Sequence, residues 1–186
     1  MGAVIVAAGA SRRLGSPKAL LLYEGETFIG RLARHFQTVA EKVVVVCRPD
    51  LPLAVGDTVE VVENPDPERG MLSSLQCGLR TLAEAENVIF SPVDYASVQL
   101  ATIVTLTARH RGPLTLPTFH GKRGHPAIIS RPVIEQLLEL DPTGSPKTVI
   151  YSHLQEACLV PVDDARVVED VDTIEDYLKL VKEERR

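Results

Sequence analysis

Runs of apolar, often β-branched residues alternate along the chain with segments whose apolar positions recur at helical spacing. Such runs are typical of buried strands, whereas helical spacing indicates amphipathic helices that cover a sheet. Strands are expected from Val4 and at 42–47, 59–62, 88–90, 114–116, 127–129 and 158–162, and helices at 28–39, 72–82, 98–110, 133–140 and 173–184. This alternation predicts an α/β fold, a single three-layer domain over residues 1–186 with a mostly parallel, Rossmann-like sheet and helices on both faces.

The composition narrows the choice of ligand and location. With 45% hydrophobic residues the chain can form a substantial core, and no repeat, low-complexity tract or linker divides it. The net charge of −5 at pH 7 argues against a general nucleic-acid binder, because such proteins present a broad basic surface. No stretch approaches the ~20 apolar residues of a transmembrane helix, and no basic region precedes a signal-type segment. Three cysteines without metal-ligand spacing suit a reduced compartment, so we expect a cytoplasmic protein with neither a membrane nor a nucleic-acid partner.

Gly9 breaks the first apolar run into a small, polar, basic loop that ends at Lys18. A strand that runs into such a loop leaves backbone N–H groups without ladder partners, and an anion can bind them. Arg12, Arg13 and Lys18 add positive charge to the loop. A polyphosphate, in particular a nucleoside triphosphate, fits this loop best. The alternative is a tight turn with solvated arginines, because the loop has neither the Walker A nor the Gly-x-Gly-x-x-Gly pattern.

The loop sequence Ala7-Ala-Gly-x-Ser-x-Arg-Leu-Gly-x-x-Lys18 resembles the signature of the MobA-like nucleotidyltransferases, which attach a nucleoside monophosphate from an NTP to a phosphorylated acceptor. Ala8 makes it more similar to the cytidylyl-transferring molybdenum-cofactor branch, because the guanylyl-transferring branch tends to have a second glycine there. The resemblance implies the nucleotide-diphospho-sugar transferase type of fold. It also implies that the nucleotide is bound by Ala7, Ala8, Gly9, Ser11, Arg13 and Lys18, and that Arg13 and Lys18 are catalytic.

The loop after the third expected strand, 64–75, carries neutral polar side chains suited to reading a base or a ribose. Ser73 and Ser74 lie where a helix starts, so nearby N–H groups are free to meet an anion. The alternative is that these hydroxyls only cap the helix. Asn64-Pro, Gly70-Met and Ser74-Leu resemble the second motif of the cytidylyl branch. By that resemblance Asn64 belongs to the nucleotide site, and Gly70, Ser73 and Ser74 line the nucleobase pocket.

Two carboxylates are candidates for holding Mg²⁺. Asp94 follows the fourth expected strand, where an ion that uses one or two protein carboxylates and several waters would face the phosphate loop. The resemblance implies that Asp94 is also catalytic, and its alternative role is that of a turn former. Asp172 lies in a segment that resembles the family's Asp-Val-Asp-Thr-Pro-Glu-Asp element, which implies a second Mg²⁺ ligand, although the acids there also suit the start of a helix. Tyr95 and Ala96 depart from the Gln-Pro or Met-Pro that usually follows Asp94, so the acceptor's identity is open.

The segment 119–126 contains two glycines and several basic side chains. Without the resemblance it reads as a hairpin-like connection with solvated charges. Gly121-Lys-Arg-Gly-His-Pro126 resembles the family's Gly-x-Arg-Gly-His-Pro element, which implies that Arg123 and His125 bind the acceptor beside its pterin phosphate. Residues 140–147 match the corresponding family stretch only in part, and no role is assigned to them.

The resemblance spans residues 3–177 in the family's order of motifs. It implies a Mg²⁺-dependent transfer of CMP from CTP to a phosphorylated acceptor, molybdopterin or molybdenum cofactor, with release of pyrophosphate. Transient contact with a molybdoenzyme or its chaperone is implied as well. The alternatives are guanylyl transfer in the same cofactor pathway, transfer to a sugar or alcohol phosphate, and non-catalytic nucleotide binding by a regulatory protein.

Overall fold

The apolar runs pair into one sheet in the computed structural model, which describes residues 1–11, 13–49, 51, 53 and 55–184. Across this eight-stranded sheet the strands are β10 (Cys158–Pro161), β7 (Leu114–Phe119), β9 (Ala127–Ser130), β6 (Asn87–Pro92), β1 (Gly2–Val6), β4 (Lys42–Cys47) and β5 (Val59–Glu63), and β8 (Lys122–Arg123) pairs with β7. The central strand β1 runs parallel to both neighbours, with Val4 opposite Val44 and Phe90. The carboxyl ends of β5, β4, β1 and β6 therefore lie along one edge.

The mostly parallel α/β arrangement confirms the expected fold class, with antiparallel pairing confined to one part of the sheet. β9 runs antiparallel to β6 and to β7, and β8 runs antiparallel to β7. The connection from β7 to β9, residues 120–126, is too short for the helical crossover that a parallel pair needs. The chain turns back instead, and the basic loop is held at the sheet's edge.

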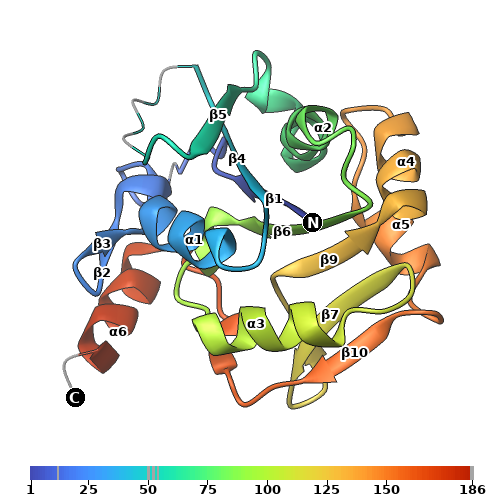
Figure 1. Ribbon diagram of the computed structural model, residues 1–186. Coiled ribbons are helices and arrows are strands. Elements are labelled where there is room, and N and C mark those ends of the chain that lie inside the picture. The colour runs from blue at the N-terminus through green and yellow to red at the C-terminus, as the bar shows by residue number, and fades with distance from the viewer. Residues whose placement is uncertain (12, 50, 52, 54, 185–186) are drawn as a thin grey trace.

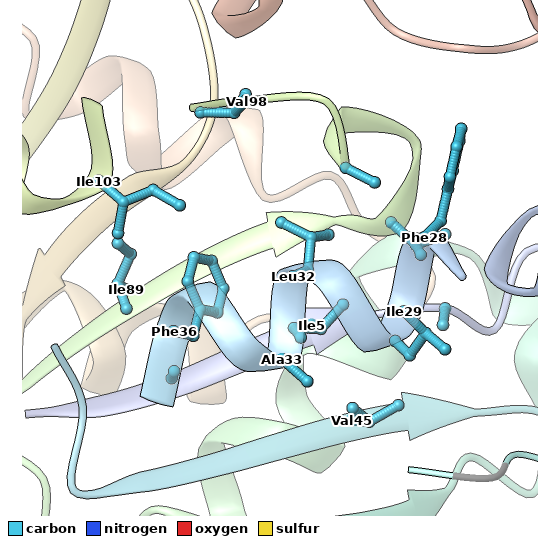
Figure 2. Close-up of a cluster of buried hydrophobic side chains, with 14 of the residues drawn as sticks. Ile5, Phe28, Ile29, Leu32, Ala33, Phe36, Val45, Ile89, Val98 and Ile103 are labelled. Atoms are coloured by element: carbon cyan, nitrogen blue, oxygen red, sulfur yellow. The ribbon is translucent and has the colours of Figure 1, made fainter. Parts of the chain in front are cut away.

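Helices cover both faces of the sheet (Figure 1). On one face lie α1 (Phe28–Gln37), α3 (Leu100–Arg109) and α6 (Ile174–Glu184), and on the other lie α2 (Met71–Thr81), α4 (Arg131–Glu139) and α5 (Lys147–Ser152). Alternate residues of β1 enter different cores: Ile5 packs with the first group and Val4 with the second. Figure 2 shows Leu32 and Phe36 of α1 lying near Ile5.

The structure adds short elements to those expected from periodicity. A hairpin of β2 (Leu22–Tyr23) and β3 (Glu26–Thr27) follows the first loop, and Thr27 caps α1 by accepting a hydrogen bond from the Gly30 amide at 3.1 Å. The 3₁₀ helices are η1 (Lys18–Leu20), η2 (Pro67–Arg69), η3 (Val93–Tyr95) and η4 (Ala165–Val168). Helix α5 was not expected, because its six residues are too few to show an apolar stripe. Within the described ranges, no helix has the length and apolar character needed to cross a bilayer.

Candidate active site

A cavity of about 360 Å³ opens where β1 and β6 end. Several strand-end segments contribute to its wall. The lining includes Ala7, Ala8, Gly9, Ser11, Arg13 and Lys18 of the first loop, Gly70, Met71 and Ser74 of the second motif, and Asp94 and Asp172. Ligands of open α/β sheets bind at this edge, so the fold places most of the expected nucleotide-binding residues where a nucleotide is expected.

The first loop is closed by its own hydrogen bonds. Ser11 adopts a positive φ of 48°, its hydroxyl accepts from the Lys18 amide at 3.1 Å, and its carbonyl accepts from the Leu14 amide at 3.1 Å. Leu14 is buried and anchors the loop in the domain. A Cβ placed on Gly9 would meet nothing within 4 Å, so the space in front of this residue is open to a ligand. Arg12, which was expected to add charge, lies outside the described residues.

Lys18 is paired with both expected metal ligands. Its Nζ lies 3.2 Å from Asp94 Oδ2 and forms a second, shorter contact with Asp172 Oδ1, while Arg13 Nη1 lies 3.2 Å from Asp172 Oδ2. Burial alone would lower the pKa of Lys18, but the hydrogen bond to Asp172 and the charge of Asp94 outweigh it, and the pKa is raised. Burial raises the pKa of the Asp94 carboxyl, and the charge of Lys18 opposes that change. The result is a partly buried network in which each cation is paired with at least one carboxylate.

The acidic side of the cavity has a donor set that suits a divalent cation. Asp94, Asp170 and Asp172 each offer a carboxylate oxygen, and these atoms lie within 4.8 Å of one another. Asp94 Oδ1 is buried and accepts no hydrogen bond from any described residue. Carboxylate oxygens are the ligands that hard cations prefer. Asp170 was missed by sequence reasoning, although its position two residues before Asp172 was a usable signal, because alternate residues of an extended segment share a side.

The second motif divides into residues that face the cavity and residues behind its wall. Gly70 and Ser74 line the cavity, whereas Asn64 and Ser73 are absent from the lining. Asn64 is buried, and its side chain donates to Ser73 Oγ at 3.0 Å and to Ser74 Oγ at 2.9 Å. The structure therefore places Asn64 as a support for the cavity wall.

A second cavity, of about 710 Å³, adjoins the first, and Met71 lines both. Arg123 and His125, the expected acceptor-binding residues, line it together. Its other notable lining residues are the aromatic Phe90, Tyr95 and Tyr151 and the cationic Lys122 and Lys147. The described residues that line this cavity include three cations and no carboxylate, so it is suited to a ligand with an apolar body and a negative charge.

Aromatic contacts organise the wall of this second cavity. The His125 ring lies 4.7 Å from the Tyr95 ring and 5.9 Å from the Phe90 ring, centroid to centroid. The Arg123 guanidinium lies over the Tyr151 ring at 5.6 Å. Burial, together with the charge of Lys147, lowers the pKa of His125 to about 4, so its imidazole is neutral at neutral pH. Tyr151 and Lys147, both in α5, were not identified from the sequence, because nothing in that segment signals a helix that faces a cavity.

Backbone contacts tie the two cavities together. The His125 amide donates to the Val167 carbonyl at 2.8 Å, and the Val171 amide donates to the Asp94 carbonyl at 3.1 Å. At Gly124 a Cβ would stand 1.9 Å from the Val167 oxygen, so only glycine allows this approach. The segment that carries Asp170 and Asp172 is thus fastened to the loop of the second cavity and to the end of β6.

Curated relatives of this chain differ in activity, and two of the three described next span nearly its whole length. The molybdenum cofactor cytidylyltransferase of Escherichia coli (strain K12) is 20% identical over 180 residues, 94% of this chain and 92% of that protein. The nicotine blue oxidoreductase of Paenarthrobacter nicotinovorans is 27% identical over 195 residues, 96% of this chain and 95% of that protein. A probable molybdenum cofactor guanylyltransferase of Bacillus cytotoxicus is 32% identical over 110 residues, 57% of this chain and 55% of that protein.

Solved structures share the architecture. Rv0371c from Mycobacterium tuberculosis H37Rv has a TM-score of 0.78 at 27% identity, covering 97% of this chain and 96% of that chain. A manganese complex of Rv0371c has a TM-score of 0.70 at 24% identity, with 97% of each chain covered. The 2-C-methyl-D-erythritol 4-phosphate cytidylyltransferase from Thermus thermophilus has a TM-score of 0.68 at 16% identity, covering 99% of this chain and 98% of that chain. The fold is therefore that of the nucleotidyltransferases.

The family model for the MobA-like NTP transferase domain matches residues 3–157, which include the first loop, the second motif, Asp94 and the basic loop of the second cavity. Together with the arrangement of these segments around two adjoining cavities, this match shows that the chain belongs to the MobA-like NTP transferase family.

Proposed function

We propose that this protein transfers CMP from CTP to a phosphorylated acceptor, molybdopterin or molybdenum cofactor, and releases pyrophosphate. The observation that carries the proposal is the network of Lys18, Arg13, Asp94 and Asp172 at the end of β1, next to a second, cation-lined cavity. One cavity is suited to a triphosphate, and the other is suited to an anionic partner that must come close to it. We place the reaction in the cytoplasm, in keeping with three free cysteines.

The chemistry assigned to the chain is positioning and charge neutralisation, as in other phosphoryl transfers. The amides of 8–11 and Arg13 would hold the β- and γ-phosphates, and Lys18 would reach the α-phosphate. An acceptor phosphate oxygen attacks the α-phosphorus, the bond to the β-phosphate oxygen breaks, and pyrophosphate leaves with that oxygen. Asp94 and Asp172 would hold Mg²⁺, which supplies further neutralisation of the phosphate charge.

The preference for CTP rests on Ala8, on the Ser73-Ser74 motif and on the likeness to the E. coli cytidylyltransferase. The acceptor proposal rests on the second cavity, whose aromatic walls suit a flat ring and whose cations suit its phosphate. Tyr95 departs from the family pattern and lies in this wall, against His125. If Tyr95 changes which acceptor is bound, the acceptor will be a sugar or alcohol phosphate instead of a pterin.

A second candidate function is supported by the likeness to the nicotine blue oxidoreductase, which is higher in identity over the whole chain than that to the cytidylyltransferase. In this candidate a reduced nicotinamide dinucleotide occupies the first cavity. The dinucleotide passes hydride to a flat conjugated molecule that lies between the aromatic walls of the second cavity. No phosphate bond is broken in that reaction, so the two candidates differ in their products.

The decisive experiment is calorimetric titration with CTP, GTP, ATP and UTP, each with and without Mg²⁺, followed by assay of pyrophosphate release. Molybdopterin, sugar phosphates and phosphocholine are compared as acceptors. Selective Mg²⁺-dependent CTP binding, with pyrophosphate released only when molybdopterin is present, is the expected result. Preference for GTP would move the protein to guanylyl transfer. Oxidation of a reduced nicotinamide dinucleotide by redox dyes, without NTP binding, would favour the oxidoreductase.

A further inference from the structure

Every polar atom of the Asn64 side chain has a partner inside the protein. The Asp66 amide donates to Oδ1 at 3.0 Å, which identifies the oxygen end of the amide without ambiguity. The nitrogen end therefore points at the two serines, and its two hydrogens reach Ser73 Oγ at 3.0 Å and Ser74 Oγ at 2.9 Å. Asn64 is 2% exposed, so neither water nor ligand competes for these contacts.

The two serines differ in where their own protons go. Ser73 Oγ donates to the Gly70 carbonyl at 2.9 Å, so this hydroxyl both accepts and donates within the protein. Ser74 accepts from Asn64 in the same way, but no described residue accepts its proton. Of the two, only Ser74 lines the first cavity. A hydroxyl carries one donor hydrogen and two lone pairs. Because Asn64 donates to one lone pair of Ser74, the hydrogen and the second lone pair are left to face the cavity.

We propose that Asn64 is a positioning residue that orients the Ser74 hydroxyl so that it donates its hydrogen into the nucleotide cavity. The ligand atom that receives this hydrogen is then an acceptor, such as a carbonyl oxygen or an unprotonated ring nitrogen of the base. Cytosine offers two such atoms side by side, O2 and N3, whereas N3 of uracil carries a hydrogen. This inference rests on the proposed function, since it takes the ligand of the first cavity to be a nucleotide.

Asn64→Asp is the sharpest test, because it is nearly isosteric and reverses the polarity of the contact. One carboxylate oxygen can still accept from the Asp66 amide, while the other accepts the Ser74 proton and turns the hydroxyl's lone pairs to the ligand. The added charge also repels a triphosphate, so the variant is measured with and without Ser74→Ala. Repulsion acts in both backgrounds and cancels from the double-mutant cycle, and the polarity effect acts only where Ser74 is present.

We expect Ser74→Ala to weaken CTP binding about tenfold. N64D should weaken CTP binding by a factor that is at least tenfold larger when Ser74 is present than in the Ser74→Ala background. The loss should fall on the KM for CTP with kcat little changed, and the ratio of CTP to UTP affinity should drop. Ser73→Ala is the matched comparison, because it removes the other partner of Asn64, and its effect on CTP affinity should be at least threefold smaller than that of Ser74→Ala.

Equal effects of Ser73→Ala and Ser74→Ala, or an N64D cost that is the same in both backgrounds, would overturn the inference while leaving CTP transfer intact. An unmodified protein that binds no NTP would instead refute the proposed function. Urea unfolding of each variant verifies that the fold is retained, and Ser74→Ala keeps the test open if N64D does not fold.

Discussion

Lys18 Nζ lies 3.2 Å from Asp94 Oδ2, an ion pair that joins the first loop to the end of β6 across 76 positions of sequence. Both partners are largely buried, with side-chain exposures of 14% and 20%. In this arrangement the cation that would meet a phosphate and the carboxylate that would meet a metal neutralise each other. Binding a nucleotide with its metal must therefore open this pair, which couples the two binding events.

Replacing Lys18 with methionine tests both halves of this relationship. Loss of a group aimed at the transition state should lower kcat by ~10²–10³. The same change frees Asp94 and Asp172, so Mn²⁺ should bind severalfold more tightly in the absence of nucleotide. Electron paramagnetic resonance of free Mn²⁺ measures this second effect. Lys42→Met is the control, because Lys42 pairs with Glu60 away from both cavities. Near-normal turnover of K18M would contradict the catalytic role.

Neutralising the three carboxylates one at a time ranks their contributions to metal binding. Asp94→Asn should weaken Mn²⁺ and Mg²⁺ binding most, since Asp94 has a buried oxygen without a hydrogen-bond partner among the described residues. Asp172→Asn should follow, and Asp170→Asn should have the smallest effect, because Asp170 is exposed. Calorimetric titration of the metal, with nucleotide present, measures the order. Unchanged affinity in the Asp94 variant would remove this residue from the metal site.

The sequence was most informative where a strand runs into a loop. The apolar runs predicted the strands, and a parallel sheet brings their carboxyl ends to one edge. The first loop and Asp94 could therefore be placed in one site from the strand pattern, whereas Asp172 was added by the resemblance to the family. Adjacent residues of a helix point about 100° apart, so Ser73 and Ser74 separate at the cavity wall. That separation depends on the exact start of α2, which sequence patterns do not fix.

Other parts of the site depend on tertiary contacts that leave no local signal. The polar side chain of Asn64 is of a type that can recognise a base, but it is buried and its amide nitrogen donates to Ser73 and Ser74 instead. Helix α5 has six residues, and its role became visible only where Lys147 and Tyr151 meet the basic loop across the second cavity. The sequence predicted that Arg123 and His125 bind the acceptor, which stays a prediction, but it did not identify Lys147 and Tyr151, which line the same cavity.

Gly124→Ala should destabilise the protein and disturb the second cavity. The new Cβ would stand 1.9 Å from the Val167 oxygen, and relieving that overlap must move backbone that also holds His125. We expect a loss of about 3 kcal/mol in the free energy of unfolding, at the upper end of overpacking costs. Gly56→Ala is the matched control, because a Cβ at Gly56 meets nothing within 4 Å. Equal stability of the two variants in urea unfolding would show that the contact is not tight.

His35 should make the protein less stable in mild acid. It lies in α1, 2% exposed, with Nδ1 buried and without a hydrogen-bond partner among the described residues. Burial, followed by the charges of Arg31 and Arg34, lowers its pKa to about 4, against the opposing effect of Glu26 and Glu24. Between pH 6.5 and 4 the unfolded chain therefore binds a proton that the folded protein does not. Unfolding then becomes easier as the pH falls through that window.

A change in the pKa of His35 from 6.5 to about 4 corresponds to about 3 kcal/mol of stability. The variant His35→Leu lacks this proton, so its stability should fall less than that of the wild type between pH 7.5 and pH 4, by about that amount. Urea unfolding across this range measures the difference, and contributions from other groups, His125 among them, cancel between the two proteins. Above pH 7.5 the curves should run parallel, separated by a constant offset. Parallel curves down to pH 4 would show that His35 is protonated equally in the folded and unfolded states.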